Sequence, residues 1–552
     1  MKKHQRSRVA AVGALAVTVS LAGLVPATAT ATATGAATGA ATSGASSAAE
    51  SRLAQGPRAL RLAVRAVGGA EALRGLRSFR YATRGERWIY DEGIRPGDRA
   101  KPSASFESLV RYKLGTRNAS NKVRVDSVRT SLGVPRPVHE VIAGRRGFIR
   151  GVDANFSSAG IKSMSGDRGA AIREELALLN PHVLLLKALR NPRMARNGGM
   201  RTLDGHTYRV LVLKHRVAPV RLFVDTATGR IARLRTVQHD YLRRDVRIEV
   251  LYKRWVFSGA GLRIPRRVAL WSDGDRLHRE VRSPASVVAN PRIRSRVFRF
   301  PAGLTPERFP VRLSRIGQKT SEWVLSFANL GFIKDGGQTA ITPQRIAPGV
   351  ILLGGVANNS MVVRRASGVV VVEGALHDHR AEAVLRFVRN RFPGEQVTHV
   401  ITTHHHSDHS GGQRPYVALG AQAVIHEAAV PFFRRVFRER DSSILPDRLD
   451  RTNRPARITA VPADGDLLLE DTDQRVEVFP FPGPHSVDMT VTFVNEGGVL
   501  FVSDVYTPGA PPGEGGQALN DLILAQSLNV EWIAGGHGGV ISYDDFLADL
   551  AG

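Results

Sequence analysis

The sequence predicts two folded parts of different class: a mainly antiparallel β module with one or two helices, followed by an α/β domain. In the first part, short alternating segments are separated by turns. Residues 245–255 are an example, because their apolar side chains fall on every second position, as in a half-buried strand. In the second part, apolar strands over 368–372 and 397–402 enclose a helical segment over 379–392. A strand–helix–strand order is typical of an α/β layer.

The order of segments along the chain indicates an exported protein. The first eight residues include four Lys or Arg, an apolar stretch follows over 9–25, and Ala27-Thr28-Ala29 offers a small-residue cleavage site. We therefore expect a secreted protein or one at the exterior of the cell envelope, with no membrane span after signal cleavage. An uncleaved membrane anchor is the alternative. The predicted parts are a signal peptide (1–31), a disordered Ala/Thr/Gly leader (32–50), a basic β-rich module (51–315), a linker (316–340) and the α/β domain (341–552).

Composition excludes several chemistries and divides the charge unevenly. The 552 residues contain no cysteine, which excludes disulfides, thiolate metal sites and a cysteine nucleophile. Residues 51–300 carry 52 Lys and Arg against 20 Asp and Glu, whereas residues 301–552 are mildly acidic. A module this basic is suited to an anionic cell envelope, although its charges could also be simply solvated. We expect no nucleic-acid partner, because no aromatic-rich basic motif or helix-turn-helix pattern is present.

Within the basic module, a helix is predicted over 54–76 and another over 170–189. Strands over 220–224 and 231–237 flank the turn Asp225-Thr226-Ala227-Thr228-Gly229-Arg230 and should pair as a hairpin. This pattern, with Phe223-Val224-Asp225 and Thr228-Gly229, resembles the half-barrels of lipoprotein carriers in bacterial envelopes. The resemblance implies a curved antiparallel sheet wrapped over a helix and an apolar concavity for an acyl chain.

A dense histidine cluster follows the apolar strand that ends at Thr402. The cluster reads His404-His405-His406-Ser407-Asp408-His409 and is followed by Gly411-Gly412. In a turn leaving a strand, His404 and His406 can point to one side and hold one metal ion, while Asp408 and His409 face a second. Imidazole and carboxylate ligands suit zinc.

The pattern His404-x-His406-x-Asp408-His409 matches the signature of the metallo-β-lactamase superfamily, and the resemblance covers about residues 341–552. It implies an αββα sandwich and further ligands at His485, Asp504 and His537, each in a loop next to a strand. By this resemblance two zinc ions bind per chain: His404, His406 and His485 hold the first, Asp408, His409 and His537 hold the second, and Asp504 bridges them. Asp408 is also expected to act in catalysis by orienting the nucleophile and passing a proton.

Three neighbouring residues receive supporting roles. His405 should face away from its two neighbours and act in packing or behind the ligands. Glu373, at the end of a core strand, should support the metal loop by hydrogen bonds. Tyr506 is a candidate donor to a developing oxyanion.

The resemblance implies a hydrolase that uses a hydroxide activated by both ions on a small-molecule ester, lactone, thioester or amide. Two alternatives stay open. One is an oxidoreductase like the persulfide dioxygenases of the same superfamily, which hold a single iron ion. The other is an envelope-binding protein in which the hydrolase domain is auxiliary.

Overall fold

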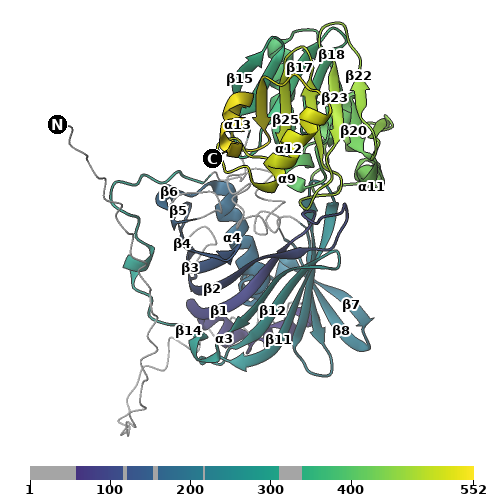
Figure 1. Ribbon diagram of the computed structural model, residues 1–552. Helices are drawn as coiled ribbons and strands as arrows, with labels where there is room; N and C mark the ends of the chain where they lie inside the picture. Colours follow the sequence, from purple (N-terminus) through teal and green to yellow (C-terminus); the bar gives the residue numbers. More distant parts are fainter. Residues whose placement is uncertain (1–56, 116–120, 153–158, 216–217, 310–338, 552) are drawn as a thin grey trace, which may run out of the picture. The chain divides into compact units, whose positions relative to one another are not determined.

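The computed structural model describes residues 57–115, 121–152, 159–215, 218–309 and 339–551 (Figure 1). The predicted signal peptide, the leader and nearly all of the predicted linker lie outside these residues. All described residues fall within one compact unit, Ala48–Gly552. Among them, no helix has both the length and the apolar character needed to cross a bilayer.

The basic module forms, in its described part, one antiparallel sheet of fourteen strands. Its order is β6-β5-β4-β3-β2-β1-β13-β12-β11-β10-β9-β8-β7, with β14 paired to β1. The predicted hairpin over 220–237 is present as the antiparallel pair β9 and β10. The strands are β1 (Ser78–Ile89), β2 (Lys101–Lys113), β3 (Lys122–Ser131), β4 (Val134–Ala143), β5 (Arg146–Gly151), β6 (Gly160–Ser163), β7 (Ala195–Leu203), β8 (His206–Leu213), β9 (Val220–Asp225), β10 (Ile231–Asp240), β11 (Arg244–Phe257), β12 (Arg263–Ser272), β13 (Asp275–Arg282) and β14 (Val288–Ala289).

Each helix predicted in this module is interrupted. The first becomes α2 (Arg58–Ala66) and α3 (Ala70–Gly75), separated at Gly68, where a Cβ would lie 2.2 Å from the carbonyl oxygen of Gly261. The second becomes α4 (Gly166–Leu179) and α5 (Pro181–Arg190). The prediction of a single helix over 170–189 was therefore wrong. The break falls between Leu179 and Pro181, because proline lacks an N–H and disfavours helical backbone in the preceding residue.

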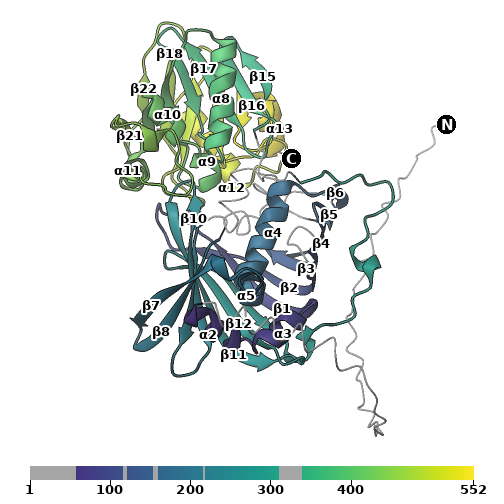
Figure 2. The same cartoon turned by 180° about the vertical axis from the view of Figure 1, so that it is seen from behind.

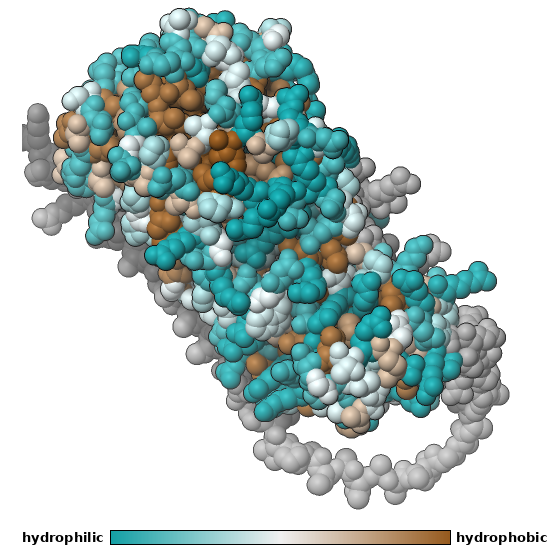
Figure 3. Space-filling model, turned by 90° about the vertical axis from the view of Figure 1, so that its right-hand side faces the viewer, coloured by the Kyte–Doolittle hydropathy of each residue, from teal (hydrophilic) through white to brown (hydrophobic). Residues whose placement is uncertain are grey.

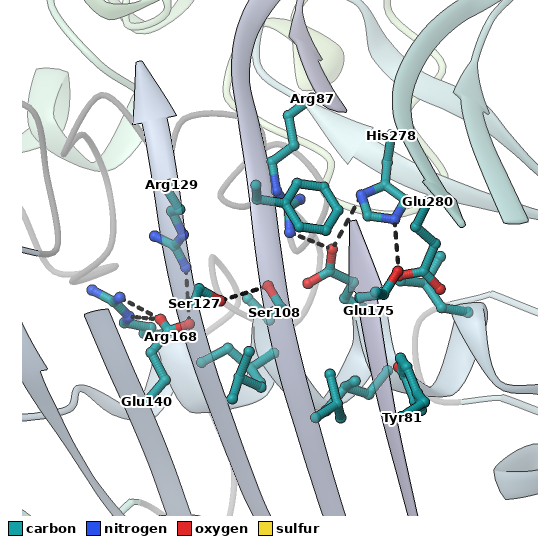
Figure 4. Close-up of a pocket in the computed structure, with 18 residues that line it drawn as sticks. Tyr81, Arg87, Ser108, Ser127, Arg129, Glu140, Arg168, Glu175, His278 and Glu280 are labelled. Carbon is teal, nitrogen blue, oxygen red and sulfur yellow. Dashed lines mark hydrogen bonds and ion pairs between the residues drawn. The ribbon is translucent and has the colours of Figure 1, made fainter. Parts of the chain in front are cut away.

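The sheet curves around α4, and a small cavity between them is lined by both charged and apolar side chains (Figures 2 and 4). Its volume is about 50 Å³, which is room for only one or two water molecules. Three ion pairs reach it, Arg168 with Glu140, Arg87 with Glu175 at 2.9 Å, and Arg282 with Glu280 at 2.6 Å. The curved sheet over a helix is as predicted. The apolar part of the lining includes Val110, Ile172 and Leu176, and the expected concavity for an acyl chain stays a prediction.

The C-terminal domain contains two mixed sheets. The first follows the order β15-β16-β17-β18-β19-β20-β21 and the second β22-β23-β24-β25-β26-β27. Their strands are β15 (Thr342–Ala347), β16 (Val350–Gly354), β17 (Ser360–Arg365), β18 (Gly368–Val372), β19 (Val397–Ile401), β20 (Gln422–His426), β21 (Ile458–Val461), β22 (Leu467–Leu469), β23 (Val476–Pro480), β24 (Thr490–Val494), β25 (Val499–Ser503), β26 (Trp532–Gly535) and β27 (Val540–Ser542). The helices are α8 (Asp378–Arg391), α9 (Ser407–Ser410), α10 (Arg414–Leu419), α11 (Val430–Arg438), α12 (Gly513–Ala525) and α13 (Tyr543–Ala551).

Alternating side chains divide this domain into four layers. In β18, Val370 and Val372 join the core between the two sheets, whereas Val369 and Val371 pack under α8, α10 and α11. On the other side, residues of β24 and β25 pack under α12 and α13. Figure 2 shows α8 and α10 covering the outer face of the first sheet. The αββα sandwich predicted for this domain is thus confirmed.

The surface is predominantly hydrophilic on the face shown in Figure 3, with hydrophobic residues in small groups. This agrees with the high content of Arg and Lys in residues 51–300.

The buried pair Glu280–Arg282 makes the stability of the β module decrease at acidic pH. Burial raises the pKa of Glu280, but Arg282 and His278 together outweigh it and lower the pKa to about 2. Since the folded pKa is below the unfolded value near 4.5, the stabilisation is present above about pH 4.5 and is lost as pH falls towards 2. We expect the midpoint of urea unfolding to fall over this window by more in the wild type than in Glu280→Gln. The matched control is Glu86→Gln, at an exposed ion pair, which should keep the wild-type pH dependence. Identical pH dependence in the wild type and Glu280→Gln would contradict this account.

Candidate metal centre

The histidine cluster leaves the carboxyl end of β19 and leads into the short helix α9. His404 and His406 lie in the loop, and Asp408 and His409 lie on the helix, all of them buried. The two glycines that follow allow the chain to pass against residues 374–377. A Cβ on Gly411 would lie 2.2 Å from the carbonyl oxygen of Leu376, and one on Gly412 would lie 2.7 Å from that of Ala375.

The structure brings all seven predicted ligand residues together from four separate loops. They form two groups, and within each group the candidate ligand atoms lie within 4.8 Å of one another. The first group is His404, His406, His485 and Asp504, and the second is Asp408, His409 and His537.

Asp504 lies between the two groups, with one carboxylate oxygen facing each. Its Oδ2 lies 3.3 Å from His485 Nε2 and 4.0 Å from His404 Nε2. Its Oδ1 lies 3.2 Å from His409 Nε2 and 3.3 Å from His537 Nε2. This is the position that a bridging carboxylate needs.

Electrostatics favour the protonation states that bind cations. Burial and the neighbouring histidines hold the pKa of His404 and of His406 well below the usual range, so both rings stay neutral. Burial raises the pKa of Asp408 and of Asp504, but His409 together with His537, and for Asp504 also His485, lowers both, so both carboxyls stay ionised. Neutral imidazoles and ionised carboxylates are the forms that coordinate a metal.

Hydrogen bonds behind the ligands select which ring nitrogen faces inward. His409 Nδ1 donates to Glu373 Oε1 at 2.9 Å, and His537 Nδ1 donates to the carbonyl oxygen of Ala357 at 2.9 Å. The Nε2 atoms of both rings therefore point towards Asp504 and Asp408. Such outer partners commonly orient metal-binding histidines. Burial lowers the pKa of His409, but the surrounding carboxylates outweigh it and raise the pKa, so this ring must release a proton before its Nε2 can bind a cation.

The supporting roles are partly as expected. Glu373 accepts hydrogen bonds from His409, Thr403 and Ser503, which agrees with its expected support of the metal loop. His405 turns away, with its Nδ1 2.7 Å from the carboxylate of Asp488. Tyr506 does not fit the role of oxyanion donor, because its hydroxyl donates to Asp549 on α13 at 3.0 Å.

Two further residues at the site were missed by the sequence reasoning. Asn358, in the loop after β16, donates from Nδ2 to Asp408 Oδ2 at 3.1 Å. Glu92, in the β module, accepts from the hydroxyl of Ser407 at 3.0 Å. The position of Asn358 just after a core strand was a usable signal, whereas nothing in the local pattern connects Glu92 with Ser407, more than 300 residues away.

The donor set fits a metal ion. Five imidazoles and two carboxylates suit zinc or iron. Asp504 Oδ1 is buried and accepts no hydrogen bond from the described residues, as expected of an atom reserved for a cation.

A four-layer αββα sandwich with a His/Asp cluster beside its strand ends is the arrangement of a class of metal-binding proteins. Residues 353–537, about a third of the chain, match the sequence model of the metallo-β-lactamase superfamily, so the C-terminal domain is similar to that superfamily.

Known structures with a similar domain include both lactamases and flavodiiron proteins. A metallo-β-lactamase from Pontibacter korlensis is 17% identical, with a TM-score of 0.30 over 38% of this chain and 98% of that one. DIM-1 metallo-β-lactamase is 15% identical, with a TM-score of 0.30 over 38% of this chain and 95% of that one. The flavodiiron protein from Giardia intestinalis is 16% identical, with a TM-score of 0.30 over 38% of this chain, and the match spans only 58% of that protein's length. No curated protein sequence matches the chain.

Substitutions at the two groups should change metal content by different amounts. If each group holds one ion, His537→Ala should remove one ion per chain, because only the second group loses a donor. Asp504→Ala should weaken the binding of both ions, because its two oxygens face both groups. Metal content after dialysis, measured by mass spectrometry, checks this. Asp473→Ala removes an exposed carboxylate and serves as the control. Full metal content in Asp504→Ala would refute the bridging position.

Proposed function

We propose that this protein is a secreted hydrolase with two zinc ions per chain that cleaves an ester, lactone, thioester or amide bond of a small molecule. The observation that carries the proposal is the position of Asp504, with one oxygen towards each histidine group. A site for one ion would not need a second group of donors on the far side of that carboxylate.

Two zinc ions bound here would lower the pKa of a shared water to about 7 and so supply hydroxide at neutral pH. The residues of the chain provide orientation and proton transfer. Asp408 is the proposed catalytic residue, because its ionised carboxylate can orient the attacking water and accept its proton. Asn358 holds that carboxylate in place through the 3.1 Å hydrogen bond from its side-chain amide.

Access to the site is easiest beside His485. Its side chain is 41% exposed, and that of His537 is 22% exposed, whereas those of His404 and His409 are fully buried. A substrate can therefore approach from the side of the 485 and 537 loops, while the 404–409 loop forms the rigid floor.

The basic β module supports a location at the cell exterior. With 52 Lys and Arg against 20 Asp and Glu in residues 51–300, it is suited to an anionic envelope polymer or membrane surface. Export itself is proposed from the pattern of residues 1–31. In this arrangement the module would keep the hydrolase near the envelope. If envelope binding is instead the main activity, it should weaken with salt and the protein should hydrolyse none of the offered substrates.

The decisive measurement combines metal analysis with a substrate panel of lactones, thioesters, carboxylic esters, amides and a chromogenic cephalosporin. We expect two zinc ions per chain, and a rate that falls about tenfold per pH unit below the pKa near 7 of the activated water. His404→Ala should reduce turnover to background because the first group loses a central donor.

The matched control is His399→Ala, at a half-buried histidine of β19 outside both groups, which should keep the wild-type rate. One iron per chain without zinc would favour the alternative of a persulfide-oxidising enzyme over the hydrolase.

A further inference from the structure

The turn that follows β1 in the β module reaches the metal loops of the C-terminal domain. The carbonyl oxygen of Gly93 accepts from His406 Nε2 at 2.8 Å. Glu92 Oε1 accepts from the Ser407 hydroxyl at 3.0 Å and from the Ser407 N–H at 3.3 Å. The carbonyl oxygen of Ile94 accepts from the N–H of Val487 at 2.9 Å and lies 3.3 Å from the Ser486 hydroxyl. Residues 91–94, the bridging turn, thus contact the two loops that carry His404, His406 and His485.

The bridging turn is itself held firmly. Arg243 binds the fully buried carboxylate of Asp91 through Nε and Nη2 at 2.9 Å each, and Tyr90 donates to Asp240 at 2.9 Å. Gly93 runs so close to Asp98 that a Cβ on it would lie 2.4 Å from the Asp98 Cβ. The turn is therefore fixed against the β module by buried polar contacts.

The neighbouring β10–β11 turn attaches the same region to the C-terminal domain. Arg244, buried, pairs with Asp450 at 2.6 Å and with Asp447 at 3.3 Å. Asp245 accepts from the hydroxyl of Ser442 at 2.7 Å. These contacts hold the bridging turn in place against the 404–409 loop.

The contact with Gly93 decides which nitrogen of His406 can bind a cation. A carbonyl oxygen only accepts hydrogen bonds, so Nε2 must carry the hydrogen and Nδ1 must carry the lone pair. His406 can therefore coordinate only through Nδ1, unlike His409 and His537, whose Nε2 atoms face inward.

We propose that the bridging turn of the β module is a positioning element of the metal centre. Gly93 sets the tautomer and orientation of His406, and Glu92 holds Ser407, the first residue of the helix that carries Asp408 and His409. The metal centre is then completed by both parts of the chain. This inference rests on the proposed metal binding and not on the substrate or on the hydrolytic reaction.

The test is cobalt(II) binding by the full chain, followed by visible absorption in competition with a chelator. Glu92→Ala removes the acceptor for Ser407, which precedes the ligands Asp408 and His409, and should lower cobalt affinity about 10–100-fold, with a changed absorption band, the range usual when a residue that orients metal ligands is lost. Glu92→Gln should restore most of the affinity, because the amide oxygen can replace Oε1 as acceptor. The matched control is Glu86→Ala, an exposed glutamate on β1 paired with Arg279, which should bind cobalt as the wild type does.

Wild-type affinity and spectrum in Glu92→Ala would overturn the proposal, as would an equal loss in Glu92→Gln, because the role would then depend on charge and not on accepted hydrogen bonds. If Glu92→Ala fails to fold, Ser407→Ala decides, because it removes the hydroxyl that donates to Glu92. Ser407→Ala alone should lower the cobalt affinity. The double variant with Ser407→Ala and Glu92→Gln should bind cobalt as tightly as Ser407→Ala alone. These readouts need no substrate, so absence of hydrolysis with intact cobalt binding would contradict the proposed function alone.

Discussion

Three carboxylates lie close together in the interior of the C-terminal domain, and their need for positive charge governs the site. Asp408, Asp504 and Glu373 are each within 3.3 Å of His409, and no lysine or arginine is paired with them in the part of the chain that the structure describes. Burying ionised carboxyls is costly unless counter-charges compensate. Cations at the two histidine groups would supply that charge, which explains why five histidines converge from loops so far apart in sequence.

The sandwich provides the rigidity that such a site requires. Strands β19, β25 and β26 end next to one another in space, and the apolar core between the sheets fixes those ends. Donor atoms carried on short loops from buried strands lose little conformational freedom when an ion binds. Outer partners complete the arrangement, since Glu373 and Ala357 each select the nitrogen that a histidine presents.

The β module has the curved sheet over α4 that its resemblance to lipid carriers implied. Paired arginines and glutamates lie beside apolar side chains at the small cavity between sheet and helix. Alternation of side chains predicts which face of a strand is inward, yet it cannot tell whether an inward arginine finds a carboxylate there. Likewise, helical periodicity over 170–189 could not outweigh the effect of Pro181 on the backbone.

From the sequence by itself, the order of apolar strands and helices predicted an α/β layer, and the signature of His404, His406, Asp408 and His409 within six positions carried a family resemblance. That resemblance implied the sandwich and the candidate ligands His485, Asp504 and His537. Only the tertiary structure decided how the loops that carry these residues meet, that Asp504 faces both groups and that Asn358 holds Asp408. It alone connected Glu92 and Gly93 with His406 and Ser407, more than 300 positions away. Contacts between distant segments depend on how whole sheets pack, and no local pattern encodes them.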